Sequence, residues 1–198
     1  KVANGSNKAY MGVAGDNKAY FGSFSATDVV LAHGTSGKWT LNSLGNLFPA
    51  ATSQGIVLGN TSDVAANRLK DYEEGTWTPR IEGSTTAGNY SGVARGGYYT
   101  RIGNIVTIRG YFDGNSGSGA GNLILEGLPF TRAGTNISNS IQANGNLTIP
   151  SGVITMSWMD SSGTAFYVRC TKSNAAFVYL AYPTRAEYIR FQITYEIA

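Results

Sequence analysis

Histidine and cysteine are almost absent, since the 198 residues include one of each. A Ser-His-Asp triad could be built only around His33, which lies beside a glycine turn and is expected to be a solvated turn residue. A single cysteine cannot form a disulfide within the chain or a cysteine-based zinc site. Cys170 alternates with Phe166 and Val168, which favours a buried structural thiol over a reactive one. The sequence therefore predicts no catalytic residue, no metal site and no cofactor.

Charged residues and long apolar runs are scarce as well. Asp, Glu, Lys and Arg make up 14% of the chain, against about 25% in a typical soluble protein. The basic residues are not clustered, so the net charge of +3 does not predict nucleic-acid binding. No apolar run approaches the ~18 residues of a membrane span, which predicts no membrane insertion. The chain begins at Lys1 in mid-pattern, and we expect it to be a fragment of a longer polypeptide.

Glycine and aromatic residues are plentiful, with 26 Gly, 12 Tyr and 8 Phe. Residues that favour the exposed faces of helices are few. The hydrophobic content of 42% is nevertheless enough to supply a core, which argues against disorder. This balance predicts an all-β protein with many turns.

The first seventy residues contain a short repeat. Residues 7–12 recur at 17–22, and a third unit runs from 28 to 41 around a turn at 34–37. Strands this short cannot bury a core by themselves, so we expect them to pack against sister chains. The sequence predicts a β-repeat shaft over residues 1–70. Residues 62–74 could hold a short helix or an extended linker.

Longer alternating patterns follow residue 79. The hairpin prediction places strands at 98–102 and 105–112 around the favoured turn Gly103-Asn104. Residues 189–197 alternate most regularly, with the odd-numbered positions apolar. Further strands are predicted at 122–126, 137–141, 153–159, 165–171 and 176–180. Such a series predicts a β-sandwich or jelly roll over residues 80–198.

The stretch DYEEGTWTP at residues 71–79 separates these two parts. Five of the six lysines precede it, whereas eight of the nine arginines follow it. Trp77 and Pro79 are expected to set the geometry of this junction. Glu73 and Glu74 are expected to form ion pairs or turn hydrogen bonds there. Ligand contacts are therefore expected on the exposed strand faces and loops after the junction, and not at these two residues.

The same stretch resembles a junction in the tail fibres and tailspikes of tailed bacteriophages. Four other segments are similar to that family, at residues 41–49, 97–108, 127–130 and 189–195. The resemblance implies a homotrimer on the virion, with a β-structured shaft and a tip that acts outside the host. It also implies binding to a bacterial surface polysaccharide or lipopolysaccharide. A threefold axis could gather three copies of His33, but no second ligand supports a metal site there.

Two alternatives to receptor binding remain open. The tip could serve trimerisation and folding, and stabilise an upstream tailspike depolymerase without binding a receptor itself. Glycan hydrolysis would need two carboxylates roughly 5–9.5 Å apart. No pair stands out in the sequence, although a trimer could assemble one across subunits. We expect the chain not to be an enzyme.

Aromatic and polar residues after the junction are the candidates for sugar binding. Aromatic rings stack on the apolar faces of sugars, while Asn, Asp and Arg bind hydroxyl groups. Tyr167 and Arg169 are expected to be exposed, because they alternate with Phe166, Val168 and Cys170. The predicted ligand-binding residues are Tyr98, Tyr111, Asp113, Tyr167, Arg169 and Tyr182. For any one aromatic residue, packing in the core or in a subunit interface is the alternative.

Overall fold

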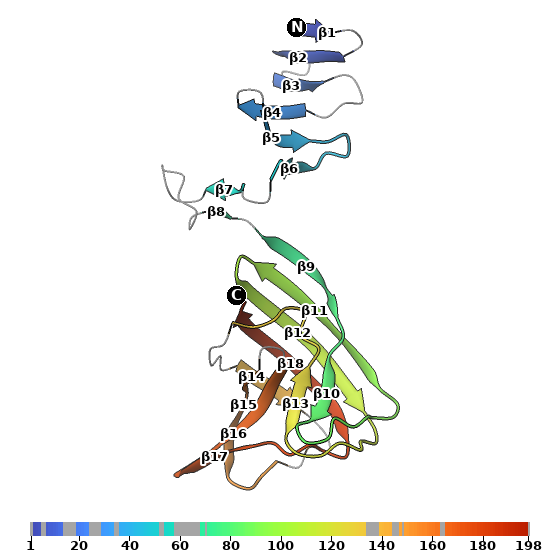
Figure 1. Cartoon of the computed structure of the whole chain (residues 1–198), viewed down its shortest axis with the longest axis vertical. Coiled ribbons are helices and arrows are strands. Elements are labelled where there is room, and N and C mark those ends of the chain that lie inside the picture. Colours follow the sequence, from blue (N-terminus) through green and yellow to red (C-terminus); the bar gives the residue numbers. More distant parts are fainter. Residues whose placement is uncertain are drawn as a thin grey trace. The chain divides into compact units, whose positions relative to one another are not determined.

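In a computed structural model, the chain divides into two compact units, Lys1–Lys70 and Asp71–Ala198 (Figure 1). All the secondary-structure elements among the described residues are β-strands, which confirms the all-β prediction. None of those residues forms a helix long and apolar enough to cross a membrane. The structure describes residues 2–4, 7–13, 19–23, 29–33, 36–51, 54–57, 68–69, 71–133, 139–143, 147, 149–162 and 165–197.

Short antiparallel strands make up the first unit. Its described strands are β1 (Val2–Asn4), β2 (Asn7–Val13), β3 (Ala19–Ser23), β4 (Val29–His33), β5 (Ser36–Leu41), β6 (Leu47–Pro49), β7 (Ile56–Val57) and β8 (Arg68–Leu69). They pair as β1-β2-β3, β4-β5-β6 and β7-β8. The first copy of the repeat, residues 7–12, falls in β2, and residues 19–22 of the second copy fall in β3; the two strands pair with Val13 opposite Ala19. Of the turn predicted at 34–37, residues 34 and 35 lie outside the described residues, and Ser36 and Gly37 begin β5.

The turn between β5 and β6 is closed by one asparagine side chain. Asn42 Oδ1 accepts hydrogen bonds from the backbone N–H groups of Leu44, at 3.0 Å, and of Asn46, at 2.9 Å. Gly45 has a φ of 84°, which glycine adopts without steric cost. The Asn and Gly residues of this stretch therefore reverse the chain locally.

The β4-β5-β6 sheet has an apolar face, which we call the shaft face. Residues directly opposite each other in antiparallel strands share a face. Leu31, Trp39 and Pro49 form one such row. The other row is Val29, Leu41 and Leu47. Leu31 is 48% exposed and Leu47 57%, and no side chain described in the first unit is buried.

The second unit contains ten described strands. They are β9 (Tyr72–Trp77), β10 (Arg80–Gly83), β11 (Ala94–Ile102), β12 (Ile105–Gly114), β13 (Leu123–Glu126), β14 (Asn139–Ala143), β15 (Val153–Ser162), β16 (Ala165–Lys172), β17 (Ala175–Tyr179) and β18 (Ala186–Glu196). Their antiparallel order among the described residues is β10-β13-β16-β15-β14-β18-β12-β11-β9, with β17 beside β16.

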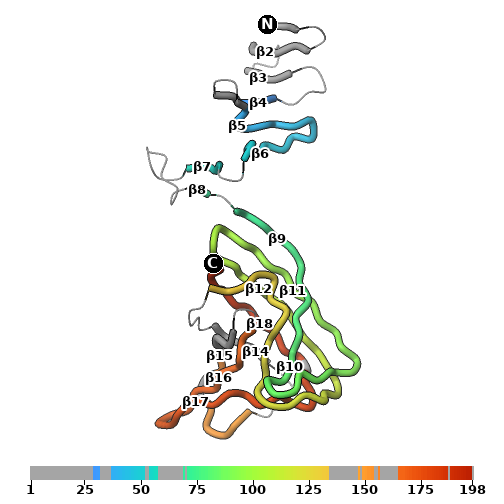
Figure 2. Tube along the Cα trace, viewed as in Figure 1, coloured from blue at the N-terminus to red at the C-terminus, as the bar shows by residue number. Residues whose placement is uncertain are grey.

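The two ends of this strand order are consecutive in the chain. Only Thr78 and Pro79 separate β9 from β10, although these strands lie at opposite ends of the order. The sheet must therefore curl until the end of β9 meets the start of β10 (Figures 1 and 2). The hydrophobic core lies inside this curl, and its largest fully buried side chains include Tyr195, Phe112 and Phe166.

Several strand predictions are confirmed. Ile102 pairs with Ile105 across the Gly103-Asn104 turn, where Gly103 has a φ of 61°. In β18 and the residue after it, the odd-numbered positions 189–197 are all buried. The helix considered for residues 62–74 is wrong where that segment is described, because residues 68–69 and 72–74 are in strands.

Residues 71–79, assigned to a junction on sequence grounds, belong to the second unit. Trp77 and Pro79 are both buried there. The register aligns Trp77 of β9, Gly97 of β11, Gly110 of β12 and Phe191 of β18 in one row across the sheet. We call this row the tryptophan row. It connects the edge strand β9 to β18 over two intervening strands.

The two glycines leave space for the rings at the ends of the tryptophan row. A Cβ atom on Gly97 would lie 2.2 Å from Trp77 Nε1, and one on Gly110 would lie 2.9 Å from Phe191 Cζ. With no side chains between them, Trp77 and Phe191 meet edge to face, with ring centroids 5.7 Å apart. Edge-to-face pairs contribute about 0.5–1.5 kcal/mol beyond the area that they bury.

Replacing Gly97 with alanine should destabilise the second unit, because the new methyl group would overlap the Trp77 indole. Overpacking of this kind typically costs about 1–3 kcal/mol. Gly96→Ala is the matched control, since its Cβ would lie 3.2 Å from the half-exposed ring of Tyr111. Thermal unfolding of the full chain measures both variants. Equal losses of stability would contradict the packing argument.

Candidate functional site

Three of the six predicted ligand residues share one face of the sheet. Tyr98 lies on β11, and Tyr111 and Asp113 lie on β12. Side chains alternate between the two faces of a strand, and Phe112, between Tyr111 and Asp113, is buried. Tyr98 is 57% exposed and Tyr111 38%. We call this surface the outer face; it comprises Tyr98, Arg109, Tyr111, Asp113, Tyr188 and Arg190.

Two arginines lie among the aromatic rings of the outer face. Arg109 pairs with Tyr98 across β11 and β12, with its guanidinium carbon 5.5 Å from the ring centroid. Arg190 pairs with Tyr111 across β12 and β18, at 5.1 Å, and lies 5.9 Å from the ring of Tyr188. Exposed cation–π contacts contribute about 0.5–1 kcal/mol each. They hold rings and guanidinium groups side by side on the surface.

Asp113 makes its contacts within the protein. Its two carboxylate oxygens accept hydrogen bonds from Arg190 Nη1 and Nη2, each at 3.2 Å. The same carboxylate accepts the backbone N–H of Tyr188. Tyr188 has a φ of 55°, a left-handed conformation that bulky residues rarely adopt. Asp113, predicted as a ligand contact, therefore holds Tyr188 and Arg190 in place.

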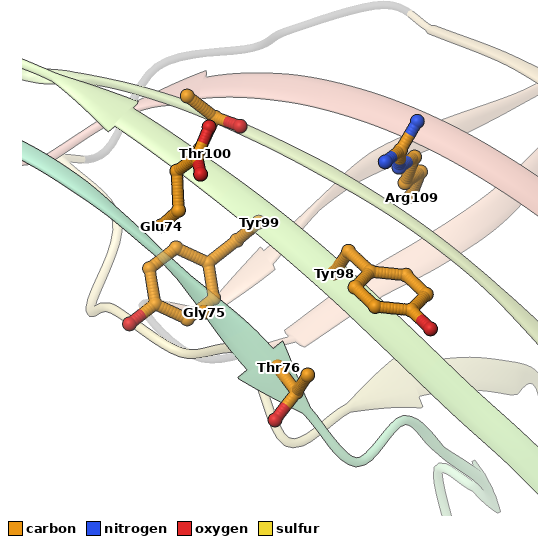
Figure 3. A pocket seen from close by; sticks show the side chains of 7 residues that line it. All are labelled: Glu74, Gly75, Thr76, Tyr98, Tyr99, Thr100 and Arg109. Carbon is orange, nitrogen blue, oxygen red and sulfur yellow. The ribbon is translucent and has the colours of Figure 1, made fainter.

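A pocket of about 280 Å³ opens beside Tyr98 (Figure 3). Thr76 lies opposite Tyr98, and Glu74 lies opposite Thr100 in the register of β9 and β11. Figure 3 shows Tyr98 and Arg109 toward one end of the group, with Glu74 and Thr100 toward the other. The residues that line the pocket are Glu74, Gly75, Thr76, Tyr98, Tyr99, Thr100 and Arg109.

The two glutamates of β9 accept hydrogen bonds from tyrosine hydroxyls. Tyr72 donates to Glu74, and Tyr99 donates to Glu73 Oε1 at 2.6 Å. Each hydrogen bond to the carboxylate stabilises the neutral phenol and raises the pKa of its tyrosine. Hydrogen bonding at these positions was expected. Glu74, which was not among the predicted ligand contacts, also lines the pocket.

Tyr167 and Arg169 form a separate cluster with β17. Tyr167 lies against Tyr179, with ring centroids 4.7 Å apart, and the Arg169 guanidinium carbon is 3.9 Å from the Phe177 ring centroid. Both predicted residues are half-buried beside these rings rather than fully exposed. The alternating residues behind them are fully buried, as expected: Phe166, Val168 and Cys170. Burial raises the pKa of the Cys170 thiol, in keeping with a structural role.

Tyr182 lies apart from both clusters. Its ring stacks on Tyr90, with centroids 5.1 Å apart, and a Cβ on Gly119 would lie 2.6 Å from its Cζ atom. Its hydroxyl oxygen is buried. Tyr182 therefore packs the loop that contains Gly117 and Gly119, and does not extend the outer face.

The described residues contain no group of three or more His, Cys, Asp or Glu side chains that could hold a metal ion. The side chain of His33 lies outside what the structure describes. Sequence reasoning missed Arg109, Tyr188 and Arg190. The signal for the arginines was available, because both alternate with buried residues in strongly patterned strands. The conformation of Tyr188 has no comparable local signal.

Comparison with known proteins found no matching family model, no matching curated protein and no matching solved structure. The candidate site is therefore defined by its own geometry. Exposed rings, guanidinium groups and hydroxyls lie together on one side of the sheet. This combination suits a ligand that has apolar C–H faces and polar edges.

Asp113 and Arg190 should be energetically coupled, because the guanidinium group contacts both carboxylate oxygens. A double-mutant cycle with Asp113→Asn and Arg190→Gln should give a coupling free energy of about 0.5–1 kcal/mol for this partly exposed pair. Chemical denaturation of the four proteins measures it. Additive effects of the two substitutions would show that Asp113 does not hold Arg190.

Proposed function

We propose that this chain is part of a tail fibre or tailspike of a tailed bacteriophage and binds the host surface during adsorption. In this proposal the first unit forms a homotrimeric β-shaft, and the second is a tip of the β-sandwich or jelly-roll kind. The receptor is a bacterial polysaccharide or lipopolysaccharide, met outside the cell by the virion. The observation that carries the proposal is the uncovered shaft face.

The shaft face supports assembly because the exposure of an apolar sheet face to water is energetically unfavourable. Fully burying a leucine side chain contributes about 1.5–3 kcal/mol, and Leu31, Leu41 and Leu47 are all exposed. Other copies of the chain are the proposed cover. In a closed threefold assembly, the same face of every subunit can turn toward a common axis. Three chains then exclude water from all three faces together.

The outer face supports the recognition role of the second unit. Tyr98, Tyr111 and Tyr188 offer exposed rings for the C–H faces of sugars, and Arg109 and Arg190 offer donors for their oxygens. The proposed role is binding and not hydrolysis. Two carboxylates on this side, Glu74 and Asp113, already accept hydrogen bonds from protein groups.

The assembly is tested by a matched pair of substitutions in the first unit. Light scattering of the full chain should give about 63 kDa, three times the chain mass of 21.0 kDa. Leu47→Asp should reduce this to a monomer, because it puts a charge on the shaft face. Leu44→Asp should leave the trimer intact, since Leu44 is 83% exposed in the turn. A monomeric parent chain would refute the trimer.

Recognition is tested by binding the purified trimer to bacterial cells and to a panel of surface polysaccharides. The combined variant Tyr98→Ala, Tyr111→Ala should lose at least ten-fold in affinity, because each exposed ring supplies stacking area. Leu44→Asp is again the control, with unchanged binding expected. A stable trimer that binds no cell and no glycan would favour the trimerisation and folding role. Release of reducing ends from any polysaccharide would refute the binding-only role.

A further inference from the structure

Arg109 differs in its contacts from four other arginines of the second unit, Arg80, Arg95, Arg101 and Arg190. Arg80 and Arg190 form ion pairs with carboxylates. Arg95 and Arg101 donate hydrogen bonds to backbone carbonyl oxygens. Among the described residues, Arg109 has neither kind of partner, and its guanidinium group lies beside the exposed ring of Tyr98. Its donors therefore face water.

This guanidinium group lines the pocket of about 280 Å³ on the β9, β11 and β12 side of the outer face. That volume is just below the roughly 300–1,000 Å³ of typical small-molecule sites, which suits one small ring. Tyr98 supplies an aromatic wall, and Thr76 and Thr100 supply hydroxyls. The pocket thus has an apolar side, neutral polar groups and one cation without an acidic partner.

Glu74 is the carboxylate that lines the pocket, and it pairs with Thr100 across β9 and β11. Tyr98 and Arg109 lie on the adjacent row of the same face. Glu74 accepts the Tyr72 hydroxyl and keeps further lone pairs that can accept sugar hydroxyls. The pocket therefore has a positive group, Arg109, at one end and a negative group, Glu74, at the other. A ligand with a carboxylate at one end and hydroxyls at the other would match both rows.

We infer that this pocket binds a uronic-acid unit of an acidic polysaccharide, with the sugar carboxylate on Arg109 and the ring against Tyr98. Arginine binds carboxylates through two parallel hydrogen bonds, which are stronger than hydrogen bonds between neutral groups. A neutral sugar would leave that charge-assisted interaction unmade. The inference rests on the proposed function, because it specifies the ligand class of the same face.

Matched polymers test the charge requirement directly. Polygalacturonate, alginate and hyaluronan are each compared with their methyl-esterified forms, which keep the sugar backbone and remove the carboxylate charge. Binding of the full chain is measured by biolayer interferometry. At least one acidic polymer should bind ten-fold or more tightly than its ester.

Two arginine variants assign that preference to the pocket. Arg109→Gln should abolish the preference for acid over ester, while Arg109→Lys should retain part of it. Arg80→Gln is the control, because it removes the same charge from the edge strand β10 and should keep the full preference. Thermal unfolding confirms that each variant is folded.

The outcomes separate this inference from the proposed function. Equal binding of acid and ester, or a preference that survives Arg109→Gln, would overturn the uronate assignment. The uronate assignment would also be overturned if the chain bound cells or neutral glycans but none of the three acidic polymers. The receptor-binding role would stand in those cases. No binding to any cell or glycan would refute that role as well.

Discussion

The contact of Trp77 with Phe191 over Gly97 and Gly110 is the constraint on which the second unit depends. It joins the edge strand β9 to β18 across two strands whose glycines leave space for the rings. Because β9 and β10 are separated by two residues, fixing β9 also fixes where the sheet closes. Trp77, Gly97, Gly110 and Phe191, from four different strands, thus act together as one packing contact.

The outer face follows from that same packing, since side chains alternate along a strand. With Trp77 inward, Thr76 and Glu74 point outward beside Tyr98 and Thr100, and the pocket forms where these rows adjoin. The buried tryptophan row therefore positions the exposed residues of the neighbouring rows, whose own contacts are modest. Cation–π pairs and the Asp113 hydrogen bonds then orient the individual rings.

Local patterns in the sequence were enough to predict most strands of the second unit, because alternation and the Gly103-Asn104 turn act over a few residues. They could not predict which residues face each other from distant strands. Trp77 and Gly97 are twenty positions apart, and Tyr111 and Arg190 are seventy-nine apart. For that reason the sequence did not indicate that Glu74 lies beside Tyr98, that Arg109, Tyr188 and Arg190 share the outer face, or that Asp113 contacts Tyr188 and Arg190.

The two units differ in how they bury apolar side chains, and this difference bears on how the proposed receptor binding would work. The second unit buries its own core and presents a shallow, solvated face, on which each ring and guanidinium group contributes little alone. The first unit leaves the apolar shaft face exposed, and the proposed trimer would bury it. In a trimer, three weak sites would meet a repetitive polysaccharide together. Once one site is bound, the others face a high local concentration of the repeat, so avidity can exceed the affinity of one face by orders of magnitude. Assembly through the shaft face would thus make up for the modest affinity of each outer face.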